Sequence, residues 1–169
     1  MRGRLMQIPP CQTRSKPQYE PLEIALRSRF ERTIADVTER IVFVPWMPYP
    51  EYLNLSAVAD VLLDPLHYGG GVTSYDGLAT GTPIVTLPSQ YQRGRYTLGC
   101  YRKIGTLDCV ASSVQQYVEL AVRLGCDRDY RYSIKEKILA ASHLLFEDID
   151  AVRQHEAFFE QAVWAARRG

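Results

Sequence analysis

The chain has 169 residues, of which 46% are hydrophobic and 23% charged, as is typical of a globular domain with a buried core. Its 20 basic and 19 acidic residues argue against a protein that binds nucleic acid through a general basic surplus. No apolar run approaches the roughly 20 residues that span a bilayer, and the first residues lack an apolar core of signal-peptide length. We therefore expect a cytoplasmic protein without nucleic-acid or membrane partners.

The predicted elements alternate between helices and short apolar strands. In chain order we expect an irregular segment at 1–21, then a helix at 22–36, a strand at 40–46, a helix at 50–60, a strand at 61–64, a helix at 73–80, a strand at 83–89, a helix at 91–105, a strand at 107–111, a helix at 112–127, and two closing helices at 128–145 and 150–167. Glycines should end two of these helices, at Gly81 and Gly105, and a serine should cap the helix at 112–127. The apolar strands and helical connections predict an α/β fold with a doubly wound parallel sheet.

The segment "HYGGGVTSYDGLATGTPIVTLPS" (67–89) contains the most distinctive motif, three glycines in the loop that follows the predicted strand at 61–64. In a parallel sheet, ligands bind beyond the carboxyl ends of the strands, which is where Gly69–Gly71 should lie. The N–H groups at the start of the following helix, with the hydroxyls of Thr73 and Ser74, suit a phosphate or diphosphate. Asp76 lies one helical turn after Thr73, where a carboxylate suits the hydroxyls of an adjoining sugar. Together these residues indicate a nucleotide site.

A simpler interpretation stands beside this one. The glycines would then form only a tight connection, and Asp76 would only favour the N-terminus of its helix. Spacing alone does not decide between the two, because a single glycine loop is a weak motif.

Arg93 follows the next predicted strand and should lie at the same edge of the sheet. It either neutralises diphosphate charge or belongs to a solvated helix face, and we favour the first. The four cysteines form no CxxC pair and do not cluster with the three histidines. We therefore expect no metal site.

The stretch "RIVFVPWMPYPEYLNLSAVADVLLDPLHYGGGVTSYDGLATGTPIVTLPS" (40–89) resembles the C-terminal catalytic half of the O-linked N-acetylglucosamine transferase and SPINDLY family. The similarity continues more loosely through "RKIGTLDCVASSVQQYVELAVRLGCDRDY" (102–130). The resemblance implies a GT-B glycosyltransferase, in which two Rossmann-like halves face each other and the C-terminal half holds the UDP-sugar. Residues 22–169 would then be the Rossmann-like nucleotide-sugar-binding domain. The reaction implied is transfer of N-acetylglucosamine to Ser/Thr hydroxyls of proteins, with no cofactor or metal.

The resemblance also assigns roles to individual residues. Thr73 matches the family threonine that binds the diphosphate, together with the backbone of Gly70, Gly71 and Val72. Asp76 matches the ribose-binding aspartate. Lys16, in "CQTRSKPQ", resembles the catalytic lysine that contacts the diphosphate and assists the leaving group.

The sequence departs from the family pattern at several of these positions. Animal members have His-Thr-Thr where this chain has Gly71-Val72-Thr73, and a family lysine and histidine fall on Tyr49 and Tyr52. Tyr52 would still stack on a base. These differences leave the identity of the sugar open, so a GT-B transferase that uses another nucleotide sugar is an alternative.

In the family, an acceptor-binding half and tetratricopeptide helices precede the region that this chain matches. Nothing in the chain corresponds to them, so we expect a fragment or an isolated domain. A second alternative is therefore a non-catalytic module that binds UDP or serves as a docking surface through its closing helices.

Overall fold

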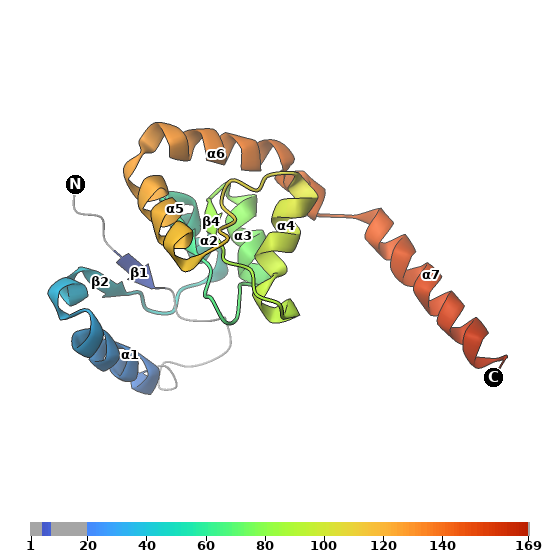
Figure 1. Ribbon diagram of the computed structural model, residues 1–169, viewed down its shortest axis with the longest axis horizontal. Coiled ribbons are helices and arrows are strands. Elements are labelled where there is room, and N and C mark those ends of the chain that lie inside the picture. Colours follow the sequence, from blue (N-terminus) through green and yellow to red (C-terminus); the bar gives the residue numbers. More distant parts are fainter. Residues whose placement is uncertain (1–4, 8–19, 169) are drawn as a thin grey trace. The chain divides into compact units, whose positions relative to one another are not determined.

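The computed structural model describes residues 5–7 and 20–168 (Figure 1). The contacts between residues divide the chain into two compact units, one up to Leu55 and one from Ser56 onward, and each is described by itself. The division differs from the predicted boundary after residue 21. The first unit includes a strand from the segment that was expected to be irregular, and this strand pairs with a later strand of the same unit.

That strand, β1 (Leu5–Gln7), is a correction to the prediction for residues 1–21. It runs parallel to β2 (Ile41–Phe43), with Leu5 opposite Ile41. Between them lie helix α1 (Glu20–Thr33) and the 3₁₀ helix η2 (Ala35–Arg40). The ring of Phe30 lies 6.3 Å from that of Phe43, and the guanidinium of Arg27 lies 4.6 Å from the same ring centroid. Aromatic and cation–π contacts therefore fasten α1 to β2.

The second unit contains the predicted succession of helices. Helix α2 (Tyr49–Val58) leads into this unit, which then has β3 (Leu62–Leu63), α3 (Val72–Ala79), β4 (Ile84–Val85), the 3₁₀ helix η3 (Gln92–Gly94), α4 (Tyr96–Ile104), α5 (Val114–Cys126), α6 (Arg128–Ala141), the 3₁₀ helix η4 (Ser142–Leu145) and α7 (Ile149–Ala166).

The predicted helix ends are confirmed. Gly81 and Gly105 have φ angles of 75° and 72°, which glycine adopts without strain, and Ser113 accepts a hydrogen bond from the N–H of Gln116.

The strands of the second unit pair in parallel, which confirms the predicted α/β class. Leu62 lies opposite Ile84, and one parallel bridge joins Thr86 to Val110. The strand predicted at 107–111 is reduced to this bridge. The reason is local, because the N–H of Val110 donates to the carbonyl of Leu107 and closes a turn there. The described strands thus form two short parallel pairs and a bridge, not one sheet of four strands.

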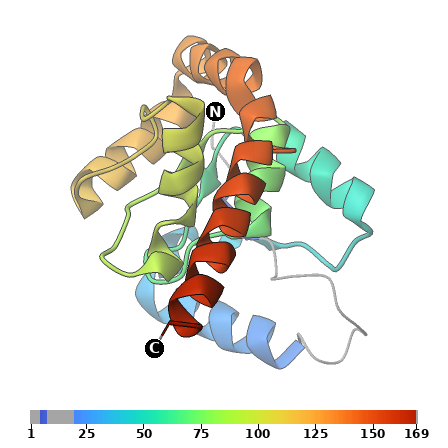
Figure 2. The same cartoon turned by 90° about the vertical axis from the view of Figure 1, so that its right-hand side faces the viewer.

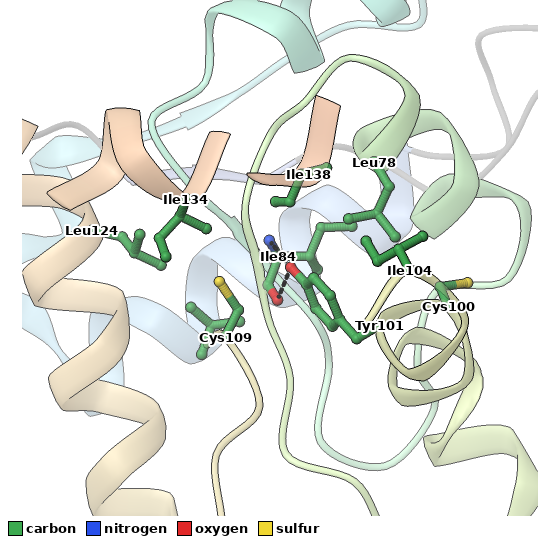
Figure 3. Packing of buried hydrophobic residues seen from close by; sticks show 10 residues of the cluster. Leu78, Ile84, Cys100, Tyr101, Ile104, Cys109, Leu124, Ile134 and Ile138 are labelled. Atoms are coloured by element: carbon green, nitrogen blue, oxygen red, sulfur yellow. Dashed lines mark hydrogen bonds between the residues drawn. The ribbon is translucent and has the colours of Figure 1, made fainter. Parts of the chain in front are cut away.

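The core of the second unit lies between β4 and helices α3 to α6 (Figure 3). Helix α3 approaches the sheet closely at Gly77, where a Cβ atom would lie 2.7 Å from the Leu62 side chain and 3.0 Å from that of Ile84. A side chain there would require the terminal methyl groups of Leu62 and Ile84 to move, so glycine permits this close packing. The fully buried members include Leu78, Val85, Tyr101, Leu124, Ile134 and Ile138.

Tyr101 provides an unusual contact in this core. Its hydroxyl accepts a hydrogen bond from the N–H of Ile84 at 2.8 Å and donates one to the carbonyl of Ile84 at 3.0 Å (Figure 3). The carbonyls of Pro83 and Val85 accept hydrogen bonds from the β3 side, so the groups of Ile84 between them face the opposite edge. The Tyr101 hydroxyl thus takes the place of a neighbouring strand. Burial raises the pKa of this phenol well above its ordinary value, so it stays protonated.

Replacement of Tyr101 by phenylalanine should test this contact. Tyr101→Phe leaves a buried N–H and a buried carbonyl of β4 without partners, which should lower the free energy of unfolding by about 1–3 kcal/mol. Urea denaturation followed by circular dichroism measures the loss. Tyr132→Phe is the matched control, since Tyr132 is 64% exposed. Equal stability of the two variants would contradict the interpretation.

Candidate functional site

The glycine turn is held by the carboxylate of Asp64, which directly follows β3. This side chain is only 5% exposed. Its Oδ1 accepts a hydrogen bond from the N–H of Gly70 at 2.7 Å, and its Oδ2 accepts one from the hydroxyl of Thr86 at 2.7 Å. The main-chain carbonyl of Asp64 accepts a hydrogen bond from the hydroxyl of Tyr117 at 3.0 Å. Asp64 therefore joins the ends of two neighbouring strands to the turn and to α5.

The glycines permit a close approach of backbone to this carboxylate. A Cβ atom on Gly69 would lie 3.1 Å from both Asp64 oxygens, and one on Gly70 would lie 2.5 Å from Ser74 Oγ and 2.8 Å from Thr73 Oγ1. A Cβ atom on Gly71 would meet nothing within 4 Å. Two of the three glycines are thus needed for the packing of the turn itself, as in the simpler interpretation.

The geometry corrects one expectation about the glycine amides. The N–H of Gly69 donates to the carbonyl of Arg93 at 2.7 Å, and that of Gly70 donates to Asp64. These two N–H groups are engaged within the protein, so the expectation that the backbone N–H of Gly70 donates to the diphosphate is not met in this structure. Gly70 can still bring the chain close to a ligand.

The N-terminus of α3 presents the donors that remain. In the described part of the chain, the N–H groups of Gly71, Val72 and Thr73 donate no hydrogen bond, and no side chain caps the helix. Thr73 is exposed. Unpaired N–H groups at the positive end of a helix dipole form a binding site for an anion.

Ser74 and Asp76 differ from Thr73 in that both are buried. The hydroxyl of Ser74 bonds to the carbonyl of Gly70 at 2.9 Å and to Thr97 Oγ1 at 2.8 Å, so it is not the ligand donor that the sequence suggested. Asp76 is 7% exposed and lies in the second turn of α3, which begins at Val72. A role limited to favouring the helix N-terminus would require a place in the first turn.

Arg93 lies beside the glycine turn. It belongs to η3 and not to the start of α4, contrary to the expected helix at 91–105. Its Nε donates to the carbonyl of His67 at 3.3 Å, and its guanidinium lies 4.8 Å from the ring centroid of Tyr91. The side chain is exposed at the edge of the turn, and its role toward a ligand stays a prediction.

The remaining predicted residues belong to the first part of the chain. Lys16 lies outside the described residues. Tyr52 lies on α2 in the first unit, where its ring stacks on that of Tyr49 with 6.3 Å between centroids. Among the described residues, no group of three or more His, Cys, Asp or Glu side chains could hold a metal ion. No described helix is both long and apolar enough to cross a membrane.

The chain belongs to glycosyl transferase family 41, whose model matches residues 23–149. It is 36% identical over 110 residues to the UDP-N-acetylglucosamine–peptide N-acetylglucosaminyltransferase of Caenorhabditis elegans, a match that covers 64% of this chain and 10% of that protein. The enzyme of the same name from Giardia intestinalis is 26% identical over 73% of this chain and 8% of its own length. The chain thus spans about a tenth of the length of these curated relatives.

A solved structure shows the same similarity. It is a mutant of the O-GlcNAc transferase of Thermobaculum terrenum, with a TM-score of 0.69 and 26% identity over 79% of this chain and 27% of that one. The SPINDLY relative from Oryza sativa is 26% identical over 61% of this chain and 12% of its own length. The predicted family and fold are confirmed.

Alkaline pH should weaken the contact between α5 and the turn. Burial, and secondarily the charge of Asp64, raise the pKa of Tyr117 to about 12, above the usual value near 10. Its stabilising contribution is therefore complete below about pH 10 and is lost as the pH rises through about 12. Tyr117→Phe should be less stable than the wild type at about pH 8, and the difference should narrow by about pH 11. Urea denaturation at both pH values measures this, and a constant difference would contradict it.

Proposed function

We propose that this chain is the nucleotide-sugar-binding half of a glycosyltransferase, which transfers N-acetylglucosamine from UDP to Ser/Thr hydroxyls of a protein acceptor. The observation that carries the proposal is the set of N–H groups at the start of α3 that donate to no described residue, in the segment that follows the carboxyl end of β3. Membership of glycosyl transferase family 41 and the names of the relatives support the donor and the acceptor.

The diphosphate would bind at the start of α3. The N–H groups of Gly71, Val72 and Thr73 and the hydroxyl of Thr73 would donate hydrogen bonds to it, and Gly70 would let it approach the backbone. The exposed guanidinium of Arg93 would offset part of its charge. Asp76 would bind the ribose hydroxyls and Tyr52 would stack on the base.

The contribution of this half to catalysis would be stabilisation of the leaving UDP. The bond between the anomeric carbon and the β-phosphate oxygen breaks as the acceptor oxygen bonds to the same carbon. Negative charge then grows on the diphosphate, where fixed N–H dipoles and the cation of Lys16 would stabilise it without a metal. The acceptor hydroxyl loses its proton to a group outside this chain.

The proposed partners follow from the fact that the chain spans only about a tenth of the length of its curated relatives. The acceptor-binding GT-B half and the tetratricopeptide repeats would come from the rest of the full-length protein. A cytoplasmic location is part of the same proposal. A donor other than UDP-N-acetylglucosamine remains the alternative at this site, because Val72 and the preceding glycine replace polar residues of the animal enzymes.

Calorimetric titration of the chain with UDP tests the site. We expect saturation at a one-to-one ratio. Thr73→Val should weaken binding about tenfold and Asp76→Ala about tenfold to a hundredfold, the effect of losing one hydrogen bond to a charged group and one or two to a ribose. Asp129→Ala is a control on the exposed first turn of α6. No heat from a folded sample, or equal affinity in all variants, would contradict the proposal.

A second candidate function, a docking module, is favoured by α7. Helix α7 is drawn in red in Figure 2, and none of its residues is buried. Its large apolar side chains Phe158, Phe159 and Trp164 are exposed by 64%, 62% and 60%. The rings of Phe158 and Phe159 meet edge to face at 5.6 Å and line a depression of about 280 Å³ with Gln154 and His155. Large exposed apolar side chains in one place are typical of a binding surface.

Self-association should report on this surface. Light scattering after size exclusion should show a mass that increases with the concentration of the wild-type chain. Phe159→Asp should abolish the increase, because a charge in an apolar contact is costly to desolvate. Gln161→Asp, on the same helix, is the control for added charge. A wild-type chain that stays monomeric at every concentration would argue against docking between copies.

A further inference from the structure

We propose that Asp64 is the positioning residue of the donor site, which fixes the glycine turn so that the N–H groups of residues 71–73 face an anion. This inference rests on the proposed function. Neither the glycine motif nor the family resemblance assigned a role to Asp64, which the sequence analysis places at the end of a predicted apolar strand.

The first step is that the carboxylate is anchored to rigid backbone. Thr86 is 1% exposed and donates to Asp64 Oδ2, while its own N–H and carbonyl bond to Cys109 and Ala111 at 3.0 and 2.8 Å. A buried carboxylate needs hydrogen-bond donors on both oxygens, and hydrogen bonds to a charged group are the strong ones. The second donor is the N–H of Gly70, so the turn is tied to the sheet through this side chain.

The second step is that Gly70 is held on both sides. Its N–H donates to Asp64, and its carbonyl accepts from the hydroxyl of Ser74 at 2.9 Å. Ser74 is itself fixed by Thr97 of α4 at 2.8 Å. The peptide that leads into Gly71 is therefore fixed before a ligand arrives. A glycine-rich segment otherwise loses much conformational freedom on binding, and fixing it in advance favours binding.

The third step concerns the direction in which the carboxylate of Asp64 changes the affinity for UDP. Asp64 places a negative charge behind a turn that is proposed to bind a diphosphate, and Coulomb repulsion alone would make this charge unfavourable. Removal of the carboxylate should therefore strengthen UDP binding if the charge dominates and weaken it if positioning dominates. The two short hydrogen bonds and the burial of Asp64 favour positioning. A residue that only contributed to stability would change the free energy of unfolding and leave the affinity of the folded fraction unchanged.

The experiment combines calorimetry with UDP and amide hydrogen exchange measured by NMR. In Asp64→Ala, the affinity for UDP should fall about tenfold or more, and the N–H of Gly70 should lose its protection from exchange. Asp64→Asn should recover part of both, because its amide oxygen can accept from Gly70 and its NH₂ can donate to Thr86. Thr86→Val should lose part of the affinity for UDP and part of the protection of the Gly70 N–H, because it removes the donor to Asp64 Oδ2. Asp60→Ala removes a 61% exposed partner of Arg131 just before β3 and should change neither quantity.

Several outcomes overturn the inference. Tighter UDP binding in Asp64→Ala would mean that charge dominates, and an unchanged exchange rate at Gly70 would mean that Asp64 does not hold the turn. If Asp64→Ala does not fold, Asp64→Asn and Thr86→Val decide on the same two readouts. If the wild-type chain binds no UDP, the proposed function fails, and the exchange rates still decide whether Asp64 holds the turn.

Discussion

The carboxylate of Asp64 is the constraint on which the second unit depends. A charge that is only 5% exposed must be compensated by hydrogen-bond donors, and the structure supplies them from separate segments of the chain. Gly70 and Thr86 bond to the side chain, and Tyr117 bonds to the carbonyl of the same residue. A glycine turn, two strand ends and a helix therefore meet at one residue, and none can shift without leaving a buried polar group unpaired.

Much of the fold could be predicted because its signals are local. Helical periodicity located the helices, and Gly81, Gly105 and Ser113 ended or capped them as expected. Strands were harder, because pairing depends on segments distant in the sequence. β1 lies in a segment whose prolines indicated irregular structure, and it forms only because β2 offers it a parallel partner. At residues 107–111 the apolar character was correct, but a turn between Leu107 and Val110 limits the strand to a bridge.

In the candidate site, too, some features could be predicted from the sequence, whereas contacts between distant residues could not. The rule that ligands bind beyond the carboxyl ends of parallel strands led to the prediction that Arg93 lies at the same edge as the glycine turn, and Arg93 does lie beside this turn. The direction of each N–H group could not be predicted, because it depends on which acceptor lies nearby in space. Ser74 and Thr73 are adjacent and chemically alike, yet one is buried against Thr97 and the other faces solvent. The available signal for Asp64 was an acidic residue at the end of an apolar strand, in the segment that leads into the glycine turn.

The hydrogen bonds of the Tyr101 hydroxyl also affect how well the edge of β4 is protected while the chain is still folding. Unpaired N–H and carbonyl groups along a strand are a template on which another polypeptide can add, and natural proteins protect such edges. At Ile84 the protection is a single phenol, supplied by a helix that follows β4 in the chain. Until α4 has folded onto the sheet, this edge can recruit a strand from a second molecule. Aggregation of newly made chains should therefore depend on how fast that helix docks.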